Sequence, residues 1–191
     1  MIDPHFVIVA AVFNVLGGLS YLIATLKGQV KPNRVTWFLW AVVPLIAFVA
    51  EIKQGVGLTS LMTFMVGFNP ALIFCASFLN KKAEWKLSRF DIGCGALSVL
   101  GIVLWRITGT GNIAILMSIL ADGFAAIPTI VKAYKAPKTE NYLVYLGGAI
   151  SAVITLLTIK SWTLAFYGFP LYILFVTALM VFLIKSPRKA L

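Results

Sequence analysis

The sequence predicts an all-α integral membrane protein with seven transmembrane helices, arranged as two three-helix-bundle repeats joined by a linker helix. Three observations lead to this fold class. Of the 191 residues, 61% are hydrophobic and only 12% are charged, and the mean hydropathy is +0.98, which exceeds what a soluble domain of this size can bury. Seven apolar segments are joined by short loops, and two of these loops have similar sequences.

Each apolar segment is close to the roughly 20 residues that a helix needs to cross about 30 Å of hydrocarbon. The segments cover residues 6–26, 35–52, 57–79, 91–107, 112–134, 142–159 and 162–184. The first could be a signal peptide, but no Lys or Arg precedes it and no obvious small-residue cleavage site follows it, so we expect a helix. Cys75 and Cys94 fall in or beside these segments, where a free thiol acts as a small hydrophobe, and they predict neither a disulfide nor a metal site.

Two loops of similar sequence predict the internal repeat. Residues Lys27–Pro32 read KGQVKP and residues Lys132–Pro137 read KAYKAP, and each loop lies between the first two of three apolar segments. Paired repeats around a central site are a common construction of transporters. The repeat divides the chain into a first three-helix bundle, an inner loop with the linker helix, and a second bundle with a basic C-terminal tail, over residues 1–79, 80–111 and 112–191.

The basic residues predict the orientation in the membrane. If the amino terminus lies outside, the inner loops and tail hold all 16 Lys and Arg residues except Lys53, Arg106 and Lys160. This bias favours an external amino terminus and a cytoplasmic carboxyl terminus, and the compact loops point to a bacterial inner membrane. The net charge of +10 then reflects topology and attraction to an anionic inner leaflet, with no nucleic-acid partner. Interfacial aromatic anchors are expected near the inner boundary at Trp37, Trp40, Trp85, Tyr134, Tyr142 and Tyr145.

Three helices, one linker helix and three further helices in the same orientation resemble the SWEET sugar transporters and the wider PQ-loop superfamily. That family carries a Pro-Gln pair near the inner end of the first helix of each repeat. Here the second repeat has Pro128-Thr129, and the aligned position in the first is Ile23-Ala24, so the resemblance covers nearly the whole architecture but half of the signature. It implies that interior prolines let each bundle rock. Four prolines lie inside the predicted segments: Pro44, Pro70, Pro128 and Pro170. They are either hinges for this rocking motion or merely tolerated helix kinks.

Polar residues near the centres of the predicted segments are the candidate binding groups, because an unsatisfied amide or carboxylate in hydrocarbon costs several kcal/mol. Asn69 matches the third-helix position at which SWEET and SemiSWEET transporters place an asparagine that hydrogen-bonds sugar hydroxyls. The structural alternative is an interhelical hydrogen bond or a cap on the helix break at Pro70. The equivalent position of the second repeat lacks an asparagine, so the candidates that complete the polar surface are Asn14, Tyr167 and Tyr172.

Asp122 is the only acidic residue near the middle of a predicted segment, and its aligned position in the first repeat is Gly17. A carboxyl group at this depth can bind and release a proton, which would let a proton travel with a substrate. Some PQ-loop amino-acid exporters are thought to use aspartates in this way, so the resemblance also implies a proton-coupled transporter of amino acids or other metabolites. The alternative is an Asp122 that stays protonated or bonds to a neighbouring helix.

The sequence shows no catalytic pattern. His5 is the only histidine, and we find no Cys or His cluster, no phosphate-binding loop and no convincing nucleophile with a base. We therefore expect no enzyme, cofactor or metal. The leading interpretation is a transporter of a small polar solute, in the first place a sugar, that works by alternating access through a midplane pocket. The competing interpretation is a seven-helix receptor or interaction protein that binds without transporting, and a homo-oligomer is compatible with either.

Overall fold

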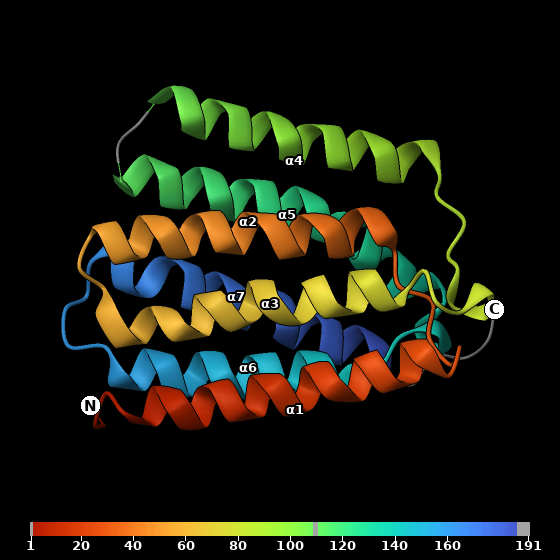
Figure 1. Ribbon diagram of the computed structural model, residues 1–191, viewed down its shortest axis with the longest axis horizontal. Helices are drawn as coiled ribbons and strands as arrows, with labels where there is room; N and C mark the ends of the chain where they lie inside the picture. Colours follow the sequence, from red (N-terminus) through yellow and green to blue (C-terminus); the bar gives the residue numbers. More distant parts are fainter. Residues whose placement is uncertain (1, 109–110, 187–191) are drawn as a thin grey trace.

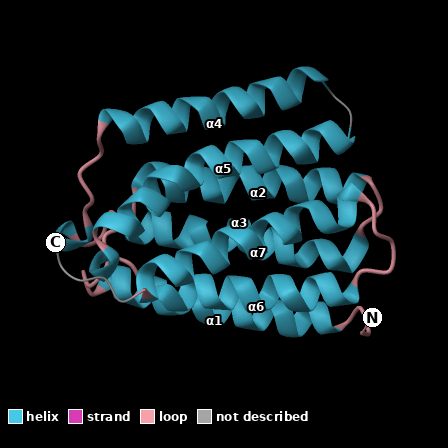
Figure 2. Ribbon diagram, turned by 180° about the vertical axis from the view of Figure 1, so that it is seen from behind, coloured by secondary structure: helices cyan, strands magenta, loops and turns pink. Residues whose placement is uncertain are grey.

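The computed structural model describes residues 2–108 and 111–186, and α-helices make up nearly all of this part of the chain. The helices lie side by side along one long axis, and the described residues include short 3₁₀ turns but no strand (Figures 1 and 2). The bounds of the α-helices are α1 Phe6–Leu26, α2 Arg34–Lys53, α3 Leu61–Ala76, α4 Arg89–Thr108, α5 Gly111–Lys135, α6 Tyr142–Thr158 and α7 Leu164–Lys185.

Each predicted segment coincides with one of these helices over most of its length, and most bounds agree within one or two residues. The third segment differs most, because it begins with the 3₁₀ turn Gly57–Ser60 and its α-helix ends at Ala76. The physical reason for the early end is visible at Ser77, whose carbonyl oxygen accepts a hydrogen bond of 2.8 Å from the guanidinium of Arg34. Basic side chains commonly satisfy the last carbonyl groups of a helix in this way.

The protein has the features of an all-α membrane protein. Within the described residues, five helical stretches are long and apolar enough to cross a membrane: α1, α2, the continuous stretch Gly57–Ala76 that contains α3, the Ile115–Lys135 part of α5, and α7. Helix α6 is apolar but has only 17 residues, and α4 is not among the five. That all seven helices cross the membrane therefore stays a prediction.

The packing of the helices places the two halves of the chain against each other. Helix α3 packs against both α1 and α2, and α7 packs against both α5 and α6, while α4 lies at the edge of the bundle against α5 (Figure 1). The halves meet where α1 contacts α6 and α2 contacts α5. Glycines permit the first of these contacts, because a Cβ atom on Gly147 would lie 2.5 Å from the carbonyl oxygen of Phe13. Small residues bring membrane helices this close together.

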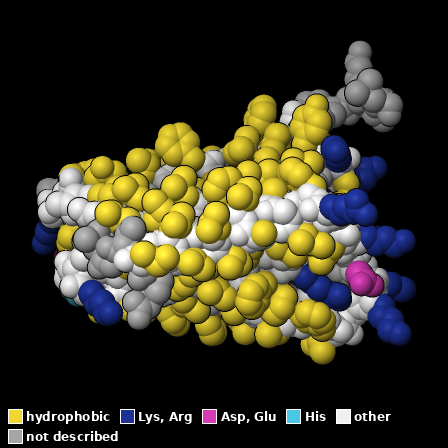
Figure 3. Space-filling view, turned by 90° about the horizontal axis from the view of Figure 1, so that it is seen from above, with side chains coloured by type: hydrophobic (Ala, Val, Ile, Leu, Met, Phe, Trp, Pro, Cys, Tyr) yellow, Lys and Arg dark blue, Asp and Glu magenta, His cyan; other side chains and the backbone are white. Residues whose placement is uncertain are grey.

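The two ends of the bundle differ in charge. The backbone N–H of Ile2 donates to Leu157 at the end of α6, whereas Lys185 lies over the ring of Tyr142 at its start, so the ends of the described chain lie at opposite ends of the bundle. Figure 3 shows Lys and Arg side chains gathered mainly at one end, with hydrophobic side chains over the middle. We call this the basic end; it contains the loops over residues 27–33, 77–88 and 136–141. The predicted tail residues Arg188 and Lys189, and the side chain of Arg106, lie outside the described part.

Candidate functional site

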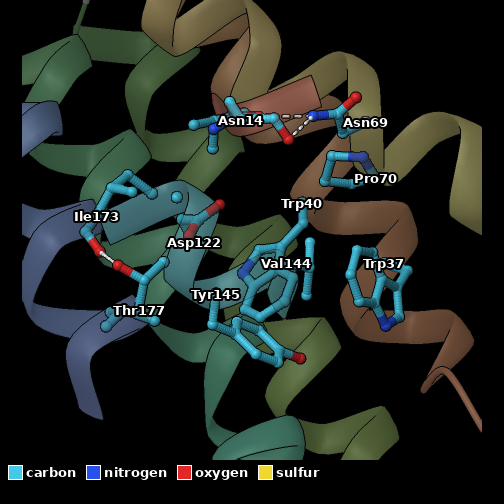
Figure 4. A pocket seen from close by; sticks show the side chains of 13 residues that line it. Asn14, Trp37, Trp40, Asn69, Pro70, Asp122, Val144, Tyr145, Ile173 and Thr177 are labelled. Atoms are coloured by element: carbon cyan, nitrogen blue, oxygen red, sulfur yellow. Dashed lines mark hydrogen bonds between the residues drawn. The ribbon is translucent and has the colours of Figure 1, made fainter. Parts of the chain in front are cut away.

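A cavity lies in the middle of the bundle, between the two halves, and we call it the central cavity (Figure 4). Water-sized molecules can occupy about 70 Å³ of it, which is room for a few waters at roughly 10–15 Å³ each. A solute as large as those of ordinary ligand pockets, roughly 300–1,000 Å³, requires the helices to move apart. The cavity is lined by Asn14, Trp37, Trp40, Val66, Asn69, Pro70, Asp122, Val144, Tyr145, Gly148, Ile173, Val176 and Thr177.

The first half of the chain contributes a pair of asparagines. The side-chain amide nitrogen of Asn69 on α3 donates to the side-chain oxygen of Asn14 on α1 at 2.6 Å and to its carbonyl oxygen at 2.9 Å. Gly18, one turn after Asn14, makes room for this pair, because a Cβ atom there would lie 2.5 Å from the Asn69 side chain. The amide oxygen of Asn69 and the side-chain amide nitrogen of Asn14 have no partner among the described residues, so the pair keeps an acceptor and a donor for a ligand.

The second half contributes a carboxyl group. Asp122 on α5 is buried, and its Oδ2 accepts a hydrogen bond of 2.7 Å from the hydroxyl of Tyr172 on α7. Its Oδ1 is buried without a partner within the described residues, as are the indole N–H groups of Trp37 and Trp40. Figure 4 shows the indole nitrogen of Trp40 on the side that faces Asp122. The cavity therefore presents acceptors, Oδ1 of Asp122 and the amide oxygen of Asn69, together with the indole N–H of Trp40 as a donor, and a small polar ligand can bind to both kinds of group.

Aromatic rings form the part of the wall that is nearest the basic end. The ring centroids of Tyr21 and Trp37 are 4.6 Å apart, those of Trp37 and Trp40 are 5.4 Å apart, and those of Trp40 and Tyr145 are 6.4 Å apart. The prediction that Trp37, Trp40 and Tyr145 are interfacial anchors is wrong, because all three are buried and Trp37 is only 1% exposed. Their depth along the helices resembles that of an anchor, but they lie on the sides of α2 and α6 that face the other half. Trp162, which is 61% exposed, differs in this respect from the three buried aromatic residues.

A buried ion pair closes the basic end below these rings. The Nζ atom of Lys132 lies 2.5 Å from Oε1 of Glu140, and the two side chains are 1% and 0% exposed. The hydroxyl groups of Tyr145 and Tyr21 donate to Oε2 of Glu140 at 2.8 Å and 3.1 Å, and Lys132 also donates to the carbonyl oxygen of Lys31. We call this set of residues the inner network. It connects α1, α5 and α6 to the loop that precedes α2.

Sequence reasoning missed the inner network because it counted Lys132 among the charges of the inner loops. One signal was present in the sequence. Lys132 and Glu140 have opposite charges and lie at the two ends of one short loop, and Tyr145 follows near the start of the next segment. Glu51 is likewise a buried acidic residue: it lies near the end of α2 and accepts a hydrogen bond of 3.0 Å from Thr63.

The remaining candidate residues lie in different places. Tyr167 is at the start of α7 with its ring 6.0 Å from that of Trp162, and it does not line the central cavity. Pro70 lines the cavity. The other three candidate prolines lie inside helices away from its wall: Pro44 in α2, Pro128 in α5 and Pro170 in α7.

In the described residues, no group of three or more His, Cys, Asp or Glu side chains could hold a metal ion, and Cys75 and Cys94 are free thiols. Comparison of the chain with known proteins found no match among family models, curated proteins or solved structures. The interpretation of the site therefore depends on its geometry and chemistry.

Proposed function

We propose that this protein is a membrane transporter that moves a small polar solute, in the first place a sugar, by alternating access through the central cavity. The observation that carries the proposal is the set of unpaired polar groups around a cavity in the middle of an apolar helix bundle. Each such group costs about 1–3 kcal/mol while it is unpaired. A solute with several hydroxyl or amine groups can satisfy the groups of both halves at once, which favours a polar ligand in this cavity.

The helix packing supports two repeats that move relative to each other. Exchanging α1 with α5, α2 with α6 and α3 with α7 converts the contact between α1 and α6 into the contact between α5 and α2. The spacing that aligns Lys27 with Lys132 also aligns Gly18 with Gly123. Gly18 lies against Asn69 of α3, and Gly123 lies against Tyr172 of α7. This correspondence favours the proposed likeness to SWEET and PQ-loop transporters, in which a solute site lies between two three-helix bundles.

The inner network gives the proposed transporter a closed end. Tyr145 lines the central cavity and also donates to Glu140, so the aromatic rings and the ion pair separate the cavity from the basic end. We place the basic end in the cytoplasm and the amino terminus outside, in a bacterial inner membrane, because basic residues concentrate on the cytoplasmic side of membrane proteins. Release of a solute into the cytoplasm then requires the contacts of Glu140 with Lys132 and Tyr145 to break.

A second candidate is a proton-coupled transporter of amino acids or related metabolites. The unpaired Oδ1 of Asp122 favours it, because this atom can take a proton or accept a hydrogen bond from a ligand ammonium group. A neutral sugar needs only a hydrogen-bond acceptor, which Asp122 offers with or without its proton, whereas the ammonium group of an amino acid pairs with the charged carboxylate. The two candidates therefore differ in what Asp122 does during the cycle.

Counterflow of labelled sugars and amino acids into proteoliposomes at two pH values tests these proposals. We expect saturable exchange that is lost in Asn69→Ala, and we expect Asp122→Asn to remove any dependence on pH. Matched controls are Asn112→Ala and Asp3→Asn, which change exposed residues outside the cavity and should leave exchange unchanged. Saturable binding without exchange, in protein shown to be folded, would replace the transporter by a receptor. Exchange that persists in Asn69→Ala would remove the central cavity from the pathway.

A further inference from the structure

A second and larger cavity lies at the basic end, outside the contact between the two halves. It is bounded by the linker that precedes α4, by the first turn of α4 and by the last two turns of α5, and we call it the linker pocket. Water-sized molecules can occupy about 310 Å³ of it. This volume falls in the range of ordinary ligand pockets, roughly 300–1,000 Å³, and the pocket adjoins the proposed transport pathway only through Lys132.

The rim of the linker pocket carries two lysines that are free to bind an anion. Lys86 and Lys135 both line the pocket, both are exposed, and neither forms an ion pair or hydrogen bond with the described residues. Lys132 also reaches the pocket, where its Nζ atom lies 5.1 Å from the ring of Trp85, but its charge is engaged by Glu140. The available positive charge therefore comes from Lys86 and Lys135.

The one carboxyl group in the wall does not cancel this charge by pairing with either free lysine. Both oxygens of Asp91 are occupied by neutral donors: Oδ1 accepts from the side-chain amide of Asn33 at 2.9 Å, and Oδ2 accepts from the backbone N–H and hydroxyl of Ser88 at 2.6 Å and 2.8 Å. These bonds hold the start of α4 to the start of α2 and to the linker. Asp91 thus shapes the pocket, and its oxygens are already hydrogen-bonded to Asn33 and Ser88.

The rest of the wall is apolar and continues onto the outer surface of the bundle. Phe90 and Val131 line the pocket, and Phe90 is 51% exposed. The surface of α4 beyond Phe90 carries further exposed apolar side chains, among them Ile92 and Leu97. Figure 3 shows this change in chemistry, from basic side chains at the end of the bundle to hydrophobic side chains along its middle. A ligand that fits both parts has an anionic head and apolar chains.

We propose that the linker pocket binds an anionic phospholipid of the inner leaflet, with its phosphate group at Lys86 and Lys135 and its acyl chains along Phe90 and Val131. Basic pockets between membrane helices on the cytoplasmic side are suited to anionic head groups, and each lysine near the surface strengthens binding about fivefold. Inorganic phosphate shares the chemistry of the head group but cannot use the apolar wall. The proposal requires the protein to lie in a membrane and does not depend on transport.

Native mass spectrometry of the purified full chain in detergent, titrated with phosphatidylglycerol or phosphatidylcholine, tests this site. We expect tighter binding of phosphatidylglycerol, and about 25-fold weaker binding in the double variant Lys86→Ala with Lys135→Ala. The matched control is Lys81→Ala with Lys138→Ala, which removes the same charge from exposed residues of the basic end outside the pocket. It should bind phosphatidylglycerol within about twofold of the wild type.

Three outcomes would overturn the proposal. Equal binding of the two lipids would show that the head-group charge is not recognised. An equal loss of affinity in the control pair would show diffuse attraction of the basic end in place of a pocket. Displacement of phosphatidylglycerol by millimolar inorganic phosphate, with full retention of phosphate binding by Phe90→Ala, would assign the site to a soluble anion.

Discussion

The inner network makes a quantitative prediction about stability. In Glu140→Gln the side chain keeps its shape, but Lys132 loses the one carboxylate partner that it has among the described residues, while it stays buried beside Trp85 and the carbonyl oxygen of Lys31. Removing one partner of a buried ion pair costs about 3–5 kcal/mol, because the other charge is left uncompensated. For a chain of this length each kcal/mol lowers Tm by roughly 2–4 °C. We therefore expect the Tm of Glu140→Gln in detergent to lie roughly 6–20 °C below that of the wild type.

The second variant separates a buried charge from a general loss of packing. Lys132→Met combined with Glu140→Gln removes both charges, and we expect it to regain most of the lost stability, because replacing a whole buried pair is often neutral or stabilising. Lys138→Met is the matched control, since Lys138 is exposed at the same end, and its Tm should change by about 1 °C or less. Additive losses in the double variant would refute the reasoning, and so would a loss of less than 1 kcal/mol in Glu140→Gln.

Two further substitutions test the two halves of the central cavity. Gly18→Ala places a Cβ atom against the Asn69 side chain and should cost about 1–3 kcal/mol by overpacking, which is measured as a lower Tm. Its control is Gly93→Ala in α4, where a Cβ atom has open space around it; this substitution should be neutral or stabilise the protein by up to about 1 kcal/mol. Tyr172→Phe leaves Oδ2 of Asp122 unpaired and should cost about 1–3 kcal/mol. Tyr167→Phe removes a hydroxyl that forms no hydrogen bond with the described residues and should change stability by less than about 0.5 kcal/mol. Equal effects of a substitution and its control would contradict either expectation.

The positions of the helices could be predicted from the sequence because hydrocarbon thickness sets the length of an apolar segment. Segment 6–26 coincides with α1, and the others differ from their helices mainly at the ends. Ends are harder to predict, since they depend on contacts between distant residues. Arg34 ends α3 by binding the carbonyl oxygen of Ser77, and no pattern within residues 57–79 contains that contact.

The candidate site could be predicted in part. Asn14, Asn69 and Asp122 line one cavity, as expected for polar groups that hydrocarbon excludes. Trp37 and Lys132 were assigned other roles because position along a helix shows depth but not which side of the helix faces the bundle. An aromatic residue near a helix end is equally typical of an anchor and of a buried ring, and a lysine there is equally typical of a loop charge and of a buried ion pair. The packing of α2 against α5, and of α1 against α6, decides between them.

The unequal chemistry of the two halves narrows what the central cavity can hold. Helices α1 and α3 present an amide pair, Asn14 with Asn69, whereas α5 and α7 present an acid with a phenol, Asp122 with Tyr172. A two-fold symmetric ligand would therefore meet an amide oxygen on one side and a carboxyl group on the other. Groups that donate hydrogen bonds satisfy both sides, and only a carboxyl group changes its charge when it binds a proton. The asymmetry thus favours a solute that donates hydrogen bonds to both halves and can also accept one from the indole of Trp40, and it makes Asp122 the residue whose substitution separates neutral from cationic solutes.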